Sequence, residues 1–166
     1  MRAALAMMAV GLLPAGLVAC GPGPAPVPVG RCDQADAGPS CVELGVGPDA
    51  AIAVDTVPLV HGPQGGWHLE VGLRFRATEV GDDLAVEYEA RGEDDRVLGS
   101  VRYAIEPRRL VRDGESLLRQ GDIVILDVAS GDEVLDTRVT IEVRISQGDA
   151  AATPIDERAL RVVAAP

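Results

Sequence analysis

Lysine and asparagine are absent from this 166-residue chain, and aromatic residues are scarce. The aromatic side chains are one tryptophan, one phenylalanine and two tyrosines. Sugar-binding platforms and cofactor pockets draw on several aromatic faces, so this composition argues against a carbohydrate-binding module and against a cofactor site. With so few aromatic rings, the core of any folded domain must be aliphatic.

Positive charge is also in short supply. The chain has 26 acidic residues against 15 arginines, which gives a net charge of −11. A negative surface repels nucleic acid and anionic lipid headgroups, and the sequence has no basic patch with interleaved aromatic residues. We therefore expect no nucleic-acid partner, whereas cations or basic partners remain compatible with the charge.

Familiar catalytic motifs are missing. None of the five serines lies in a Gly-x-Ser-x-Gly elbow, and both histidines fall within one short segment. The sequence also has no phosphate-binding loop and no paired metalloprotease histidines. We predict that the protein is not an enzyme and needs no cofactor, and an enzyme of unrecognised type is the alternative.

The N-terminus carries a lipoprotein signal. Arg2 precedes an apolar run, Ala3 to Val18, which ends in the lipobox Leu17-Val18-Ala19-Cys20. A run of about sixteen residues is shorter than the roughly 20 needed to span a bilayer. We predict a signal peptide over residues 1–19 and fatty acyl chains such as palmitate on Cys20. Plain secretion and a retained membrane helix are the alternatives.

Residues 20–40 are predicted to form a tether that leads into a disulfide loop. The segment Gly21 to Gly30 contains four prolines and cannot form a helix or a sheet ladder, so it reads as a semi-extended spacer. Cys32 and Cys41 remain after lipidation and are predicted to form one structural disulfide, with a redox or metal pair as the alternative. Gly21 is not the aspartate associated with inner-membrane retention, which indicates a lipid-anchored protein of the bacterial outer membrane.

From residue 41 onward, apolar residues alternate with polar ones. The clearest run places Trp67, Leu69, Val71, Leu73 and Phe75 on one strand face. Similar runs cover residues 84–90, 97–105 and 139–145, with shorter candidates at 41–44, 51–60 and 159–163. Residues 122–128 contain the unbroken apolar run Ile123 to Leu126, which predicts a strand buried on both sides. Residues 116–120 predict a helical turn at most.

These runs, separated by Gly/Asp turns, predict an all-β domain over residues 41–166. Because each strand has one apolar face, we expect an antiparallel β-sandwich of seven to nine strands, like immunoglobulin or fibronectin domains. A closed β-barrel is the alternative.

The segment from His61 to Glu70 holds both histidines and the only tryptophan. We select His61, Gln64, His68 and Glu70 as a candidate ligand or partner surface. His61, His68 and Glu70 could bind zinc or copper if they converged. The simpler alternative is a hairpin with exposed histidines and a buried Trp67. The acidic turns at residues 92–95 and 132–136 are weaker calcium candidates.

A resemblance to a known group rests on residues 41–47 and on the segment Val57-Pro58-Leu59-Val60-His61-Gly62-Pro63-Gln64-Gly65-Gly66-Trp67-His68. They resemble small lipoproteins and secreted proteins of GC-rich Gram-negative bacteria that join a GPQGG-aromatic-His segment to an immunoglobulin-like domain. The resemblance covers roughly residues 41 to 80. It implies a β-sandwich at the cell surface or in the envelope and assigns no catalytic or binding residue.

The sequence therefore predicts an envelope lipoprotein that acts as a protein-interaction or structural module. Its expected partners are the membrane, through Cys20, and another envelope protein. A metal-binding lipoprotein is the alternative function.

Overall fold

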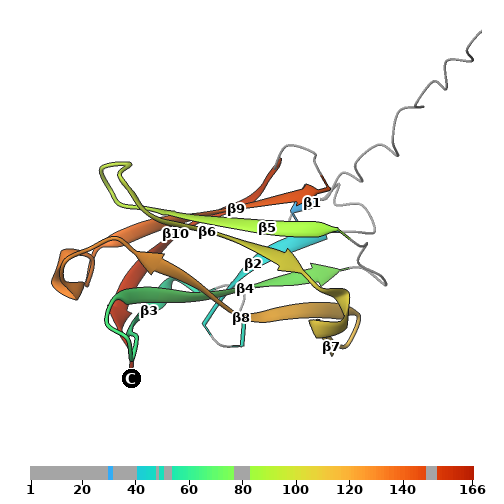
Figure 1. The fold of residues 1–166 in the computed structure, drawn as a ribbon, viewed down its shortest axis with the longest axis horizontal. Helices are drawn as coiled ribbons and strands as arrows, with labels where there is room; N and C mark the ends of the chain where they lie inside the picture. The colour runs from blue at the N-terminus through green and yellow to red at the C-terminus, as the bar shows by residue number, and fades with distance from the viewer. Residues whose placement is uncertain (1–29, 32–40, 48, 51–53, 77–82, 149–152) are drawn as a thin grey trace, which may run out of the picture.

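The computed structural model describes residues 30–31, 41–47, 49–50, 54–76, 83–148 and 153–166 (Figure 1). Its strands are β1 (Gly30–Arg31), β2 (Cys41–Val46), β3 (Thr56–His61), β4 (Trp67–Arg76), β5 (Leu84–Arg91), β6 (Val97–Ile105), β7 (Val111–Asp113), β8 (Ser116–Leu126), β9 (Arg138–Gln147) and β10 (Thr153–Ala164). Two short 3-10 turns, η1 (Pro107–Arg109) and η2 (Gly131–Glu133), are the only helical elements in the described ranges. The all-β prediction is confirmed. Within these ranges no helix is both long and apolar enough to cross a membrane.

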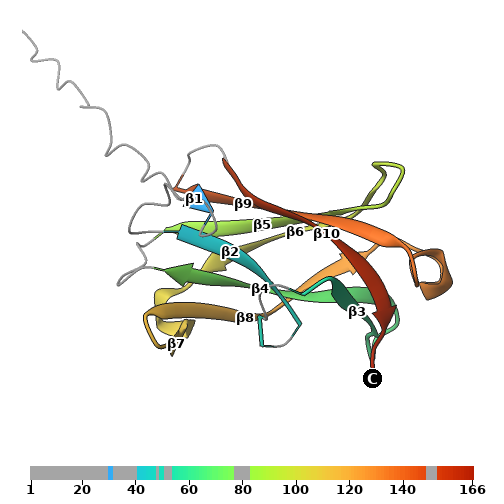
Figure 2. The ribbon, with the colours of Figure 1, turned by 180° about the vertical axis from the view of Figure 1, so that it is seen from behind.

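The strands form one continuous, curled sheet. Its hydrogen-bonded order is β1-β2-β4-β3-β10-β9-β5-β6, and β8 pairs with the opposite edge of β4 and carries β7. Figure 1 shows two layers, with β5, β6 and β9 lying over β2, β4 and β8. Strand β10 passes from the layer of β9 to the layer of β4, where it lies beside β3 (Figure 2). The result is a half-barrel that departs from the predicted pair of antiparallel sheets, because β10 runs parallel to β3 and β1 runs parallel to β2.

The core lies between the two layers and is almost entirely aliphatic. The alternation predicted for β4 is confirmed, because Leu69, Val71 and Leu73 are fully buried and Phe75 nearly so. Facing residues of β5 and β9 complete the core in the same alternating pattern. Side-chain direction alternates along each strand, so burying every second residue leaves a second, outward face on each strand.

Strand β8 departs from the sequence prediction in two ways. Residues 116–120, predicted as a helical turn at most, are its first part and pair with β4 and β7. The run Ile123 to Leu126 is buried on one side only, since Val124 and Leu126 are buried while Ile125 is 62% exposed. The expectation of a strand covered on both faces is therefore wrong within this chain.

Several predictions concern residues outside the described ranges. The signal peptide, the lipidated Cys20, the tether and Cys32 all belong to this group. Cys41, the first residue of β2, is 3% exposed. Its predicted pairing with Cys32 stays a prediction.

A buried polar network joins β8 to β5 and β6, across the seam where the curled sheet meets itself. The Tyr88 hydroxyl donates to Asp122 Oδ2 at 2.8 Å, and Arg119 Nε donates to the same oxygen at 2.6 Å. Arg119 also donates to the Ala104 carbonyl of β6. The Tyr103 hydroxyl donates to the Ile123 carbonyl at 2.8 Å, where a neighbouring strand would supply a backbone N–H. Side chains thus close most of a seam that backbone bonding crosses at the end of β8, where the Asp127 N–H donates to the Leu98 carbonyl.

A second carboxylate closes the seam between β2 and β10. Asp156 is 4% exposed, and its Oδ2 accepts a hydrogen bond from the Leu44 backbone N–H at 2.9 Å. Arg158 Nε lies 3.2 Å from the same oxygen. The strand register shifts between Pro154 and Asp156, and this irregularity lets a side chain take the place of a ladder partner.

The Tyr88–Asp122 contact predicts an alkaline loss of stability. Burial first, and then the Asp122 charge, raise the pKa of Tyr88 well above its ordinary value near 10. A raised pKa in the folded state contributes stability that is complete below about pH 10 and is lost as the pH rises further. We expect Tyr88→Phe to lower the free energy of unfolding by about 1–2 kcal/mol at pH 7 and to remove this alkaline decline, as measured by urea unfolding at pH 7 and above pH 10.

Tyr103→Phe is the matched control, because it also removes a tyrosine hydroxyl from the seam but leaves the Tyr88–Asp122 bond in place. It should keep the alkaline decline. Equal pH profiles for wild type and Tyr88→Phe would contradict the assignment.

Candidate functional site

The hairpin between β3 and β4 carries the GPQGG segment. Gly65 and Gly66 have φ values of +80° and +94°, and an added Cβ at either would meet nothing within 4 Å. The hairpin closes through hydrogen bonds from Gly62 N to Gly66 O and from Gly65 N to Gly62 O, both 3.0 Å long. These glycines supply backbone conformations that other residues rarely adopt. No other segment of the described chain lies close against them. Gln64 is exposed in this turn.

Trp67 anchors the end of the half-barrel next to this hairpin. Its ring packs against the core and lies so close to Gly131 of η2 that a Cβ there would be 2.9 Å from the indole. His61 covers it from the other side, with ring centroids 4.7 Å apart. The hairpin alternative expected a buried Trp67, and the structure shows it half-buried.

The two histidines do not converge. In the β3–β4 register, His61 is aligned with Trp67, whereas His68 is aligned with Val60. Successive residues of a strand point to opposite faces, so His61 shares the face of Trp67 and His68 lies on the other. Among the residues that the structure describes, no group of three or more His, Cys, Asp or Glu could hold a metal ion. The predicted zinc or copper site formed by His61, His68 and Glu70 is not assembled.

His68 and Glu70 nevertheless share one outward face, as predicted, and the structure adds their neighbours. His68 is flanked by Val60 on β3 and Ile125 on β8, and Glu70 is flanked by Ile123 on β8. Pro58 continues the outward row of β3 beyond Val60. We call this set the β4 face: Pro58, Val60, His68, Glu70, Ile123 and Ile125.

The β4 face is apolar at its flanks and uncovered. Ile125 is the most exposed large apolar residue of the described chain at 62%, and the other five members are half-buried. Outward strand positions in a monomeric domain are ordinarily polar, and an apolar patch rimmed by polar residues marks an interaction site. Sequence reasoning missed Ile123 and Ile125 because it assigned the whole apolar run to the core.

The β4 face has defined borders along the strands. On one side lies the β3–β4 hairpin. On the other side Ala50 is fully buried against Gly45 and Gly72, so it covers the outer surface of β2 and β4 there. The uncovered area is therefore two rows of residues across three strands.

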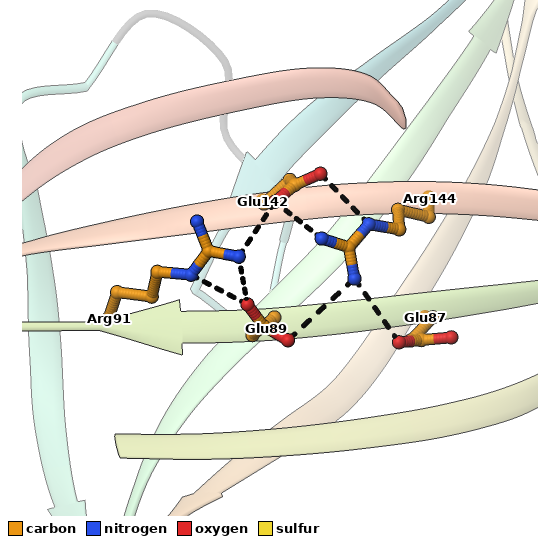
Figure 3. Close-up of polar contacts among 5 residues, drawn as sticks. All are labelled: Glu87, Glu89, Arg91, Glu142 and Arg144. Atoms are coloured by element: carbon orange, nitrogen blue, oxygen red, sulfur yellow. Dashed lines mark hydrogen bonds and ion pairs between the residues drawn. The ribbon is translucent and has the colours of Figure 1, made fainter. Parts of the chain in front are cut away.

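The outer face of the opposite layer has a different character, because its charges are paired with one another (Figure 3). Arg144 binds Glu142 through two bonds of 2.8 and 2.9 Å and also reaches Glu87 and Glu89. Arg91 bridges Glu89 and Glu142, which are directly opposite each other on β5 and β9. Two like charges in register repel, so the two arginines are required to keep β5 and β9 paired.

The acidic turns considered for calcium are already engaged in hydrogen bonds. Glu133 accepts from the Ser130 backbone N–H in the capping box of η2. Glu93 accepts from the Arg138 N–H, Asp94 from the Arg96 N–H, and Asp136 pairs with Arg161. These contacts fix loop conformations at one end of the molecule and give the carboxylates a structural role.

Comparison with known proteins adds no identification. The chain matches no protein-family model and no curated protein sequence. Its proposed role therefore depends on the residues themselves.

The charged ladder on β5 and β9 predicts unequal effects of removing arginines. Arg144→Gln leaves three glutamates with only Arg91 to neutralise them, and Glu142 and Glu89 have side chains only 10% and 15% exposed. We expect a loss of about 1–2 kcal/mol in the free energy of unfolding, measured with urea, between the values for exposed and buried ion pairs. Arg108→Gln, whose side chain is 83% exposed, should have almost no effect.

A second substitution tests the cause of that loss. Adding Glu142→Gln to Arg144→Gln removes the uncompensated charge and should recover part of the stability. An additional loss of stability in the double variant would show that packing, and not charge balance, explains the result.

Proposed function

We propose that this chain is a lipid-anchored envelope protein whose all-β domain binds a protein partner through the β4 face. The lipobox ending at Cys20 and the proline-rich spacer support the anchor and indicate the bacterial outer membrane. The observation that carries the binding role is Ile125, which is 62% exposed on β8 beside His68 and is the most exposed large apolar residue of the described chain. The relationship to small lipoproteins with a GPQGG-aromatic-His segment is likewise a proposal.

We also infer that the domain is an immunoglobulin-like module. The pairing orders β2-β4-β8-β7 and β6-β5-β9-β10 support this, since they follow the A-B-E-D and C′-C-F-G orders of immunoglobulin sheets when the strands are lettered along the chain. β3 is an additional strand, which pairs in parallel with β10, the last strand. Buried Tyr88 occupies the strand that carries a core tryptophan in antibody domains, and neither β4 nor β9 contains a cysteine.

The fold suits an interaction module. In the described part of the chain, hydrogen bonds hold several acidic turns and the charges on the outer face of β5 and β9 are paired with one another. The β4 face contains the most exposed large apolar residue, Ile125. Binding there needs no reaction chemistry, in agreement with the missing catalytic motifs.

The anchor and the binding face can be tested together in cells. Cys20→Ser should move the protein out of the membrane fraction, because Cys20 is the one cysteine that the lipobox marks for acylation. A photo-crosslinking residue at Ile125 should give a protein adduct. The same residue at Val111, which is 50% exposed on the edge strand β7, should give none.

Unchanged fractionation of Cys20→Ser would refute the lipid anchor. Equal adduct yields from positions 125 and 111, or none from either, would refute the binding role of the β4 face.

A further inference from the structure

We propose that the β4 face binds the β4 face of a second copy of this chain, related to the first by a two-fold axis. In projection onto the sheet, this axis runs between His68 and Glu70. The proposal rests on the proposed function, because it names the partner for that same face. The axis lies between the two faces, perpendicular to the strands, at the level of Leu69.

Charge complementarity selects this axis. The β4 face has one basic and one acidic side chain, His68 and Glu70, two residues apart on one strand and therefore about 7 Å apart along it. A rotation about the axis reverses the strand direction and exchanges the two rows. His68 then lies opposite Glu70 of the second copy, and Glu70 lies opposite its His68. An imidazole N–H can donate to the facing carboxylate at both places.

The same rotation matches the apolar flanks. Ile125 shares the row of His68, and Ile123 shares the row of Glu70, so each Ile125 lies over Ile123 of the second copy. Every contact occurs twice, as a closed two-fold interface requires. A two-fold axis parallel to the strands would instead place His68 over His68 and Glu70 over Glu70.

The borders of the face fit this arrangement. The β3–β4 hairpin extends beyond the row of His68, and Ala50 lies beyond the row of Glu70, against Gly72. The rotation brings the hairpin of one copy next to Ala50 of the other. Two sheets packed face to face are about 10 Å apart with strands nearly aligned, a distance that the side chains of the β4 face can fill.

The net charge of −11 opposes association of two copies. The attraction must then come mainly from apolar burial, and salt that screens the repulsion should strengthen the dimer. Six residues form a small interface compared with the roughly 800 Å² per partner of standard complexes, so we expect weak pairing in solution. A shared membrane raises the effective concentration of lipid-anchored copies.

The test uses the full chain in isolated bacterial membranes. A photo-crosslinking residue replaces Val60, and two differently tagged copies are expressed together. We expect an adduct of twice the chain mass that carries both tags, with a higher yield at 0.5 M than at 0.05 M NaCl. Ile125→Asp should lower the yield about tenfold, whereas Val111→Asp, an equivalent change at an exposed valine on β7, should leave it unchanged.

Exchange of the two polar groups tests whether the interface needs one basic and one acidic group. His68→Glu alone places carboxylates opposite each other and should reduce the adduct about tenfold. His68→Glu combined with Glu70→His restores opposite groups at both places and should recover the yield to within about threefold of wild type. Rescue shows that the face needs one group of each kind. Glu70→Gln tests the axis: it removes the His68–Glu70 pairs and should lower the yield, whereas an axis parallel to the strands would place Glu70 over Glu70, and the same change would then raise the yield.

Three results would overturn the dimer. One is failure of the exchanged variant to recover, and another is an equal loss with Ile125→Asp and Val111→Asp. The third is an adduct that never carries both tags. An adduct with a different protein at position 125 would then leave the binding role of the β4 face intact, whereas no adduct at all would remove both proposals.

Discussion

The buried carboxylate of Asp122 is the constraint on which the shape of this domain depends. A curled sheet has a seam where its last strands meet without a full ladder, and the backbone groups there must find other partners. Here Asp122 collects Tyr88 and Arg119, and Tyr103 completes the bonding of Ile123. A buried charge is tolerable only when it is paired and hydrogen-bonded, so all these groups must be in place together.

This constraint also determines which side chains face solvent. Once Asp122 is directed toward Tyr88, strict alternation makes Val124 an inward residue and Ile125 an outward one. The apolar β4 face is therefore a consequence of closing the seam and not of a defect in core packing. Asp156 performs the equivalent task at the other seam, where it receives the Leu44 N–H and holds β10 against β2.

The parts of the fold that sequence could predict are those in which one face is apolar and the other polar. β4, β5 and β9 are strands of this kind, and their faces are as the alternation indicates. The prediction that β8 is buried on both faces was wrong because Ile123 to Leu126 is apolar on both faces. Periodicity alone cannot distinguish a face that the chain buries from one that it leaves exposed. The separation of His61 from His68 depends on their register, and a hairpin loop of five residues does not reveal that register without coordinates. The parallel pairing of β10 with β3 joins distant segments and leaves no local signal.

Charge explains why a small apolar face can be specific on an acidic protein. The strongly negative surface keeps unrelated acidic proteins and the membrane surface at a distance. On β5 and β9, Arg91 and Arg144 are fully occupied by their own glutamates, so that layer offers few free charges to a competitor. What remains on the β4 face is apolar area with one imidazole and one carboxylate at a fixed spacing. Apolar area supplies the attraction, while two polar groups that must both find partners decide the orientation, because an unpaired carboxylate buried in the wrong register costs more than the contact gains.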